Sequence, residues 1–166
     1  MNDRYFELKE KDAAYYLHPF TDPKSLVEQG GQRIMSGAQG AWITDSQGRR
    51  FLDGFAGLWC VCLGYGRKEL VEAARKQMET LPYYHSFVKC GNPPAIELAE
   101  KLIEVLPDGM ERVFFATSGS EANDTIVRLI RRYWQLEGKP EKSVIISREY
   151  AYHGSTLIAS SIGGFP

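Results

Sequence analysis

The sequence has few cysteines, no long apolar run and almost no net charge. Its three cysteines, Cys60, Cys62 and Cys90, are odd in number and suggest no disulfide framework, so a reduced, cytoplasmic protein is expected. No apolar stretch approaches the roughly 20 residues that a membrane helix needs, and the polar N-terminus lacks the apolar core of a signal peptide. With 20 basic and 21 acidic residues, the composition gives no reason to expect nucleic acid or a membrane surface as a partner.

Motifs for metals and nucleotides are missing as well. Cys60 and Cys62, taken with His85 and Cys90, could suggest zinc, but their spacing fits no common site. We therefore expect no metal and treat the cysteines as small apolar residues. The pattern G-x-x-x-x-G-K-[ST] does not occur, and no G-x-G-x-x-G follows a predicted strand, which disfavours a P-loop nucleotide hydrolase.

The second half of the chain alternates short apolar runs with amphipathic stretches. We predict strands at 112–115 and 143–148, helices at 93–106 and 119–137, and a further helix beginning at 155. This alternation is typical of an α/β domain with a buried parallel sheet. Two strands do not make a stable doubly covered sheet, however, so the chain looks cut rather than finished.

Both of the long helices carry apolar residues at helical spacing, which predicts that one face of each is buried. The predicted buried residues are Ile96, Leu98, Ala99, Leu102, Ile103 and Leu106 in the first helix, and Ile126, Leu129, Ile130 and Tyr133 in the second. Three arginines of the second helix, Arg128, Arg131 and Arg132, are interpreted as a solvated face.

The first half of the chain is organised differently. It begins with a predicted helix at 3–17, which ends before a proline because the residue before proline avoids the helical region. Short strands at 33–35, 41–45 and 50–53, separated by glycine-containing turns, predict a small antiparallel sheet. A further helix is predicted at 67–81.

Two loops in this half are rich in aromatic residues. Phe20 lies between two prolines and could either plug the core or line a pocket. The stretch 54–66 combines glycines with Trp59 and shows neither helical nor strand periodicity. It could be a packed interdomain loop or the wall of a substrate pocket.

The stretch 116–123 follows the predicted strand 112–115 and opens the long helix. The first N–H groups of a helix have no intrahelical partner and carry partial positive charge, while Gly119 lets a ligand approach the backbone. This combination favours a phosphate site. The alternative is a capping box without a ligand, with Ser118 as N-cap and Glu121 three residues later. The two interpretations are compatible.

Another candidate loop, 150–154, follows the predicted strand 143–148. Ligand sites in open α/β sheets collect at the carboxyl ends of the strands. Both candidate site loops, 118–120 and 150–154, follow predicted strands in this way.

Several stretches together resemble the class III aminotransferases, which are pyridoxal-phosphate enzymes of fold type I. The residues that carry the resemblance are 18–22, 53–61, 64–66, 117–124 and 150–154. Within the family the chain looks most like the omega, or amine:pyruvate, transaminases. Each stretch alone is weak evidence, but all of them in this order are strong evidence.

The resemblance covers nearly the whole chain, as about the N-terminal third of such an enzyme. It implies an α/β fold of type I, in which a large domain with a mainly parallel sheet is cut short here. Residues 1–60 would be the N-terminal segment of a small α+β domain, and residues 61–166 the first part of the large domain that binds pyridoxal phosphate.

The resemblance also implies binding residues for pyridoxal 5'-phosphate. Ser118, Gly119 and Ser120 match the positions around the cofactor phosphate, which agrees with the helix-start argument. Tyr152 matches the aromatic residue that stacks on the pyridine ring. His153 would support that loop, although a lone histidine is often only a satisfied core residue.

Four residues match the family's substrate pocket, which Tyr152 also adjoins: Phe20, Leu58, Trp59 and Phe87. An apolar, aromatic pocket would suit amines that carry hydrophobic groups. In this family the pocket forms at a dimer interface, so a homodimer is expected. The implied reaction moves an amino group from an amine or omega-amino acid to a keto acid, with pyruvate as the expected acceptor.

The resemblance places the catalytic groups downstream of residue 166. These are the Schiff-base lysine, the aspartate that pairs with the pyridine nitrogen, and the arginine that binds the substrate carboxylate. No catalytic residue is therefore expected within this chain, and the fragment itself is expected to be inactive.

Three interpretations of function stay open. The chain could be part of an omega-type aminotransferase that is active only with the remaining chain, or a non-catalytic module that binds pyridoxal phosphate or another phosphate ligand. It could also be a structural or assembly fragment without a ligand. The missing lysine favours the second or third if 166 residues is the natural length, and the site loops favour the first if the sequence is truncated.

Overall fold

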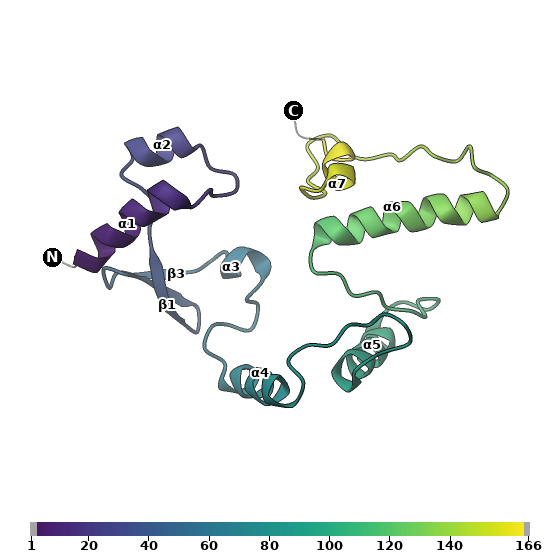
Figure 1. The fold of residues 1–166 in the computed structure, drawn as a ribbon, viewed down its shortest axis with the longest axis horizontal. Coiled ribbons are helices and arrows are strands. Elements are labelled where there is room, and N and C mark those ends of the chain that lie inside the picture. The colour runs from purple at the N-terminus through teal and green to yellow at the C-terminus, as the bar shows by residue number, and fades with distance from the viewer. Residues whose placement is uncertain (1–2, 165–166) are drawn as a thin grey trace. The chain divides into compact units, whose positions relative to one another are not determined.

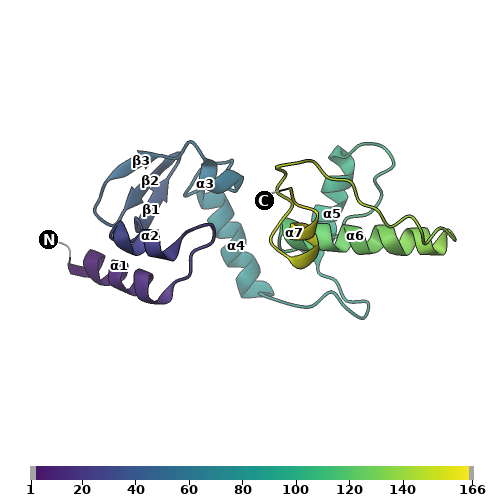
Figure 2. The ribbon, with the colours of Figure 1, turned by 90° about the horizontal axis from the view of Figure 1, so that it is seen from above.

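The computed structural model describes residues 3–164 and divides the chain into two compact units. The first unit ends at Tyr84 and the second begins at His85. Figures 1 and 2 show the elements of each unit. The boundary at residues 60/61 that the resemblance implies refers to the domains of a whole family member, and it stays a prediction.

The first unit contains helices and a small sheet. In chain order it comprises α1 (Asp3–Tyr15), α2 (Pro23–Glu28), β1 (Met35–Gln39), β2 (Trp42–Asp45), β3 (Arg50–Leu52), α3 (Ala56–Trp59) and α4 (Lys68–Thr80). Helices α1 and α4 confirm the predictions to within two residues. Helix α2 was not predicted, although the sequence carries its start signal: Asp22 accepts hydrogen bonds from the N–H groups of Lys24 and Ser25, and Pro23 occupies the first helical position.

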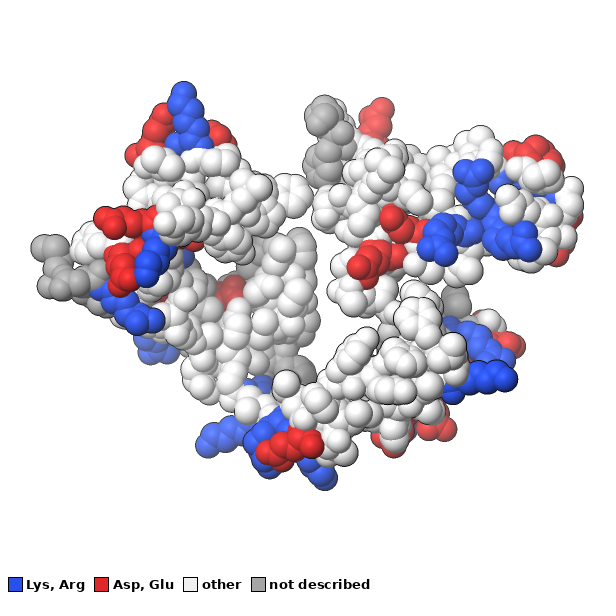
Figure 3. Space-filling view, viewed as in Figure 1, with Lys and Arg blue, Asp and Glu red and all other residues white. Residues whose placement is uncertain are grey.

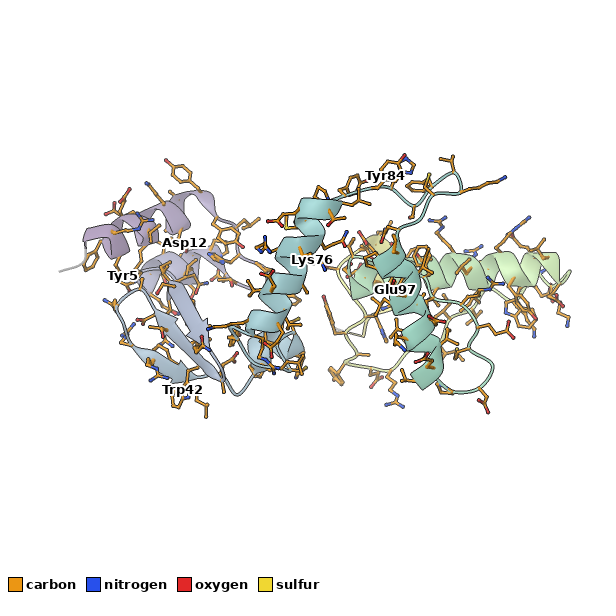
Figure 4. The ribbon with its side chains drawn as sticks, turned by 90° about the horizontal axis from the view of Figure 1, so that it is seen from below. Tyr5, Asp12, Trp42, Lys76, Tyr84 and Glu97 are labelled. Atoms are coloured by element: carbon orange, nitrogen blue, oxygen red, sulfur yellow. The ribbon has the colours of Figure 1, made fainter. Side chains whose placement is uncertain are left out.

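The sheet is antiparallel, with the strand order β1-β2-β3. Gln39 pairs with Trp42, so Gly40 and Ala41 alone connect the first two strands. Gly40 has a φ of 59°, which suits such a tight connection. The prediction that the first strand covers 33–35 was therefore wrong, because this tight turn lets the ladder continue to Gln39. Trp42 points away from α1 (Figure 4), and the Arg50 guanidinium lies 4.9 Å from the centre of its ring.

A buried carboxylate closes the turn between β2 and β3. Asp45 is only 1% exposed and accepts hydrogen bonds from the N–H groups of Gln47 (3.0 Å) and Arg49 (2.9 Å) and from the Arg49 Nε (2.7 Å). Burial alone would raise the pKa of Asp45, but the hydrogen bonds from Arg49 and Gln47 outweigh it, so the pKa is lowered. The turn is thus stabilised by an ionised side chain.

The second unit contains three helices, α5 (Pro93–Val105), α6 (Gly119–Leu136) and α7 (Leu157–Ser161). Helix α7 packs beside the N-terminal end of α6 (Figures 1 and 2). Asn92 caps α5 by accepting a hydrogen bond from the Ala95 N–H. These helices confirm the predictions from helical periodicity.

The two strands predicted in the second unit do not form within the described residues. Neither 112–115 nor 143–148 pairs with another described segment. A strand exists only through hydrogen bonds to a neighbour, and a parallel strand must be covered on both faces. Here Val144 and Ile146 are 86% and 93% exposed, so these segments have the sequence of buried strands without the sheet that would bury them.

Much of the predicted buried faces of α5 and α6 is exposed for the same reason, although Ala99, Leu102 and Ile103 are half-buried. Ile96 is 64% exposed and Leu129 is 60% exposed, whereas Val127 is the buried apolar residue of α6. The three arginines of α6 are exposed, as predicted, and Figure 3 shows Lys and Arg gathered along the C-terminal part of this helix.

No helix within residues 3–164 combines the length and the apolar character that crossing a bilayer requires.

These exposed surfaces generate a prediction for the 166-residue polypeptide produced alone. We expect its backbone amides at 112–115 and 143–148 to exchange hydrogen without protection, because they lack ladder partners. We also expect it to bind 8-anilinonaphthalene sulfonate strongly through the apolar helix faces. In a protein that continues into the sheet implied by the resemblance, the same amides should be protected. Hydrogen exchange followed by mass spectrometry compares the two, and equal protection in both would contradict this account.

Candidate functional site

The candidate site lies where α6 begins. The Ser118 Oγ accepts a hydrogen bond from the Glu121 N–H at 3.2 Å, so Ser118 is the N-cap. The Glu121 carboxylate turns back and accepts from the N–H of Thr117 at 3.1 Å and from the Thr117 hydroxyl. The capping interpretation is therefore realised, except that the return bond goes to Thr117, one residue before the N-cap.

Two backbone N–H groups at this helix start are not used by the cap. Within residues 3–164 no acceptor is hydrogen-bonded to the N–H of Gly119 or to the N–H of Ser120. A Cβ atom placed on Gly119 would meet no atom within 4 Å. The first turn of this 18-residue helix thus offers donors, partial positive charge and open space, which together suit an anion.

The loop at 152–156 docks onto the first turn of α6. The Ser120 Oγ accepts from the Ser155 N–H at 3.0 Å, and the Asn123 Nδ2 donates to the His153 carbonyl at 2.6 Å. Gly154 is buried at this contact, where a Cβ atom would lie 2.4 Å from the Ser120 Oγ and 2.8 Å from the Ala159 Cβ. The close approach therefore depends on glycine at position 154.

Asp124 connects α7 to the same helix by hydrogen bonds. Its Oδ1 accepts from the Thr156 hydroxyl at 2.7 Å and from the Ala159 N–H at 3.1 Å, and Ala159 is fully buried. No role was predicted for Asn123 or Asp124. Their spacing from Ser120 was the available signal, since residues three and four apart lie on one face of a helix.

The structure thus brings two predicted stretches together. Ser118, Gly119 and Ser120 form the helix start, and the docked loop carries Tyr152 and His153. Tyr152 is 55% exposed, whereas His153 is half-buried and its backbone is held by α6. The two site loops are thus in contact, although the strands predicted to precede them do not form within the described residues.

The predicted substrate residues are exposed and are distributed over both units. Phe20, Leu58 and Trp59 belong to the first unit, where they are 90%, 59% and 73% exposed. Phe87 belongs to the second unit and is 77% exposed. None of the four is a core residue of its unit.

Helix α3 is a left-handed turn. Ala56, Gly57, Leu58 and Trp59 have φ angles of 48°, 57°, 60° and 66°. The left-handed helical conformation costs about 1–2 kcal/mol for each residue that has a Cβ atom. Three of these four residues therefore store backbone strain, which the sequence alone did not reveal.

Asp53 organises this turn. Its Oδ1 accepts from the Phe55 N–H at 3.1 Å, and its Oδ2 accepts from the Gly57 N–H at 2.8 Å and from the Tyr65 hydroxyl at 2.7 Å. The Tyr65 hydroxyl, followed by the Gly57 N–H, lowers the pKa of Asp53, and the same bond raises the pKa of Tyr65. The pair is thus an ionised carboxylate and a neutral phenol.

Comparison with known proteins gives a consistent set of matches. The sequence model of the aminotransferase class-III family matches residues 27–164. The putrescine–pyruvate aminotransferase of Pseudomonas aeruginosa is 52% identical over 150 residues, which are 90% of this chain and 33% of that protein. The vanillin aminotransferase of Capsicum annuum is 44% identical over 134 residues, which are 80% of this chain and 29% of that protein.

Solved structures agree with these matches. The (S)-enantioselective omega-transaminase from Thermomicrobium roseum superposes with a TM-score of 0.93 and 44% identity, covering 96% of this chain and 36% of that one. The omega transaminase from Pseudomonas jessenii in complex with PMP gives a TM-score of 0.93 and 44% identity, covering 96% and 35%. The chain spans about a third of the length of the relatives it matches.

The close contact at Gly154 generates a prediction. Gly154→Ala in the complete protein should lower the free energy of unfolding by about 1–3 kcal/mol, because the new methyl group collides with Ser120 and Ala159. Gly138→Ala is the matched control, since Gly138 also has a positive φ but has no atom within 4 Å of its Cβ position. Thermal unfolding compares the two, and equal stability would show that the loop does not depend on this contact.

Proposed function

Because the chain belongs to the class-III aminotransferases, we propose that it forms part of an enzyme that uses pyridoxal 5'-phosphate to move an amino group. The donor is an amine or an omega-amino acid, and the acceptor is a keto acid. The observation that carries the proposal is the start of α6, where the N–H groups of Gly119 and Ser120 have no acceptor among the described residues and the Cβ position of Gly119 is open, beside the docked loop.

The cofactor phosphate fits this helix start. Gly119 and Ser120 would donate their backbone N–H groups to the phosphate, and Ser118 would hold the turn by its cap. When bound, pyridoxal 5'-phosphate supplies the electron-accepting ring on which amino transfer depends. The omega transaminase from Pseudomonas jessenii is known in complex with PMP, which supports the choice of cofactor.

The docked loop would orient the cofactor. Tyr152 presents an exposed ring that can stack on the flat pyridine. His153 would support Tyr152 through its backbone, because its carbonyl accepts the Asn123 amide. The role of this loop is therefore to exclude water from one face of the ring and to fix its angle.

Substrate selection would rest on Phe20, Leu58, Trp59 and Phe87, together with Tyr152. Their exposure within their own units supports a role at a surface that another molecule covers. A thermostable omega transaminase variant in which a tryptophan is replaced by glycine is engineered for asymmetric synthesis of enantiopure bulky amines. We propose that Trp59 restricts the size of the amine that this enzyme accepts.

The expected acceptor is pyruvate, which the name of the Pseudomonas aeruginosa relative supports. The lysine, aspartate and arginine of the reaction would come from chain beyond residue 166. We also propose a homodimer, which would cover apolar side chains that this chain exposes, and a cytoplasmic location, which three free cysteines favour.

The proposal is tested by Ser120→Asp in the complete enzyme. The wild type should form alanine from pyruvate with a diamine donor. The added carboxylate should repel the cofactor phosphate and raise the dissociation constant of pyridoxal phosphate by about 10- to 100-fold. Alanine formation should fall in parallel and recover when the cofactor is in excess.

Ser36→Asp, which places the same charge on the exposed strand β1, is the control and should leave cofactor binding unchanged. Cofactor affinity is measured by absorbance titration. An unaltered affinity in Ser120→Asp would overturn the phosphate assignment, and a wild type that forms no alanine with any amine would overturn the reaction.

A further inference from the structure

The left-handed turn at Ala56–Trp59 combines a strained backbone with exposed side chains. A strained backbone persists only where surrounding contacts impose it, and such strain gathers at functional sites. Leu58 and Trp59, which hold two of the strained conformations, are 59% and 73% exposed. The Trp59 ring lies 5.5 Å from the neighbouring Phe55 ring, measured between their centres, and Phe55 is itself 59% exposed.

The contacts that impose the turn converge on one carboxylate. Asp53 holds the N–H groups of Phe55 and Gly57 on its two oxygens, so it fixes the backbone before and within the turn. The turn itself closes when the Trp59 N–H donates to the Phe55 carbonyl at 2.9 Å and the Val61 N–H donates to the Ala56 carbonyl at 2.9 Å.

Tyr65 connects Asp53 and the turn that it holds to the sheet. Its hydroxyl donates to Asp53, while its backbone exchanges hydrogen bonds with Gly40 at 3.0 and 2.8 Å. The turn packs tightly against Tyr65 as well, because a Cβ atom on Gly57 would lie 2.9 Å from the Tyr65 hydroxyl and 2.8 Å from a Val61 methyl. The turn is therefore anchored to a rigid element of the fold.

We propose that Asp53, acting with Tyr65, is a positioning residue that fixes the directions of Leu58 and Trp59 and thereby sets which amines the enzyme accepts. This inference rests on the proposed function, because it takes Leu58 and Trp59 as the wall of the amine pocket. Asp53 does not touch the substrate. It holds the strained turn that presents the wall, and the lowered pKa of Asp53 keeps the carboxylate in the form that accepts all three hydrogen bonds.

The informative variants remove acceptors without removing volume. Asp53→Asn replaces one carboxylate oxygen by an NH₂ group, so it loses the bond to Phe55 or the pair of bonds to Gly57 and Tyr65. Tyr65→Phe removes one hydrogen bond and keeps the ring. Asp108→Asn is the matched control, because Asp108 is an exposed aspartate of the second unit.

The main readout is selectivity in the complete enzyme loaded with pyridoxal phosphate. The values of kcat/KM are measured for sec-butylamine and for 1-phenylethylamine with pyruvate as acceptor. In Asp53→Asn the ratio of kcat/KM for sec-butylamine to kcat/KM for 1-phenylethylamine should move toward one by about tenfold, because a mobile Trp59 no longer discriminates between amines by size. The change should arise mainly from KM. Tyr65→Phe should give a smaller change in the same direction, and Asp108→Asn should give none.

Two measurements separate positioning from a merely structural role. In a Trp59→Ala background, Asp53→Asn should leave the ratio unchanged, because the residue it positions is gone. In enzyme labelled with 5-fluorotryptophan, the ¹⁹F resonance that disappears in Trp59→Phe should shift or broaden in Asp53→Asn and Tyr65→Phe. Neither effect is expected from a general loss of stability.

The proposal is overturned if the ratio stays within about twofold of the wild type in both Asp53→Asn and Tyr65→Phe, or if the Trp59 resonance does not change. If Asp53→Asn does not fold, Tyr65→Phe decides by the same two criteria. An inactive wild type would refute the proposed function. It would not refute the claim that Asp53 and Tyr65 position Trp59, because the ¹⁹F measurement needs no turnover.

Discussion

A helix cannot satisfy its own first N–H groups, and the candidate site depends on how this chain deals with that constraint at α6. Ser118 and Glu121 satisfy the groups around the turn, while the N–H groups of Gly119 and Ser120 remain available to a ligand. The loop that docks against Ser120 does so without using these donors, since it is held by the Ser120 hydroxyl and by Gly154. Capping, docking and anion binding are therefore compatible at one helix start.

Much of the fold could be predicted because it is fixed locally. Helical periodicity and prolines gave α1, α4, α5 and α6 nearly to their ends. The strands at 112–115 and 143–148 could not be confirmed, because a strand depends on partners that are distant in sequence, and within the described residues these partners are missing. The same dependence explains why the apolar faces of α5 and α6 are exposed although their sequences predict burial.

The candidate site likewise has features that the sequence predicts and features that it does not. The helix start at Ser118, Gly119 and Ser120 could be predicted because the sequence marks it with a cap, and the phosphate site there stays a prediction. Asp53 was interpreted as the end of a strand and as part of the stretch 53–61 that carries the resemblance. Its bonds to Gly57 and Tyr65 could not be predicted, because they arise from a left-handed turn that no periodicity reveals. The resemblance identified Leu58 and Trp59 as candidate substrate residues, and the structure shows that hydrogen bonds to Asp53 hold the turn that carries them.

The central claim is that this chain contributes the phosphate site of an aminotransferase whose catalytic lysine lies outside it. The most direct test is the mass of peptides from the complete protein after addition of pyridoxal phosphate and reduction with borohydride. We expect one covalent cofactor, attached to a lysine outside residues 1–166. A cofactor attached to a lysine within these residues, or no covalent cofactor at all, would contradict the account.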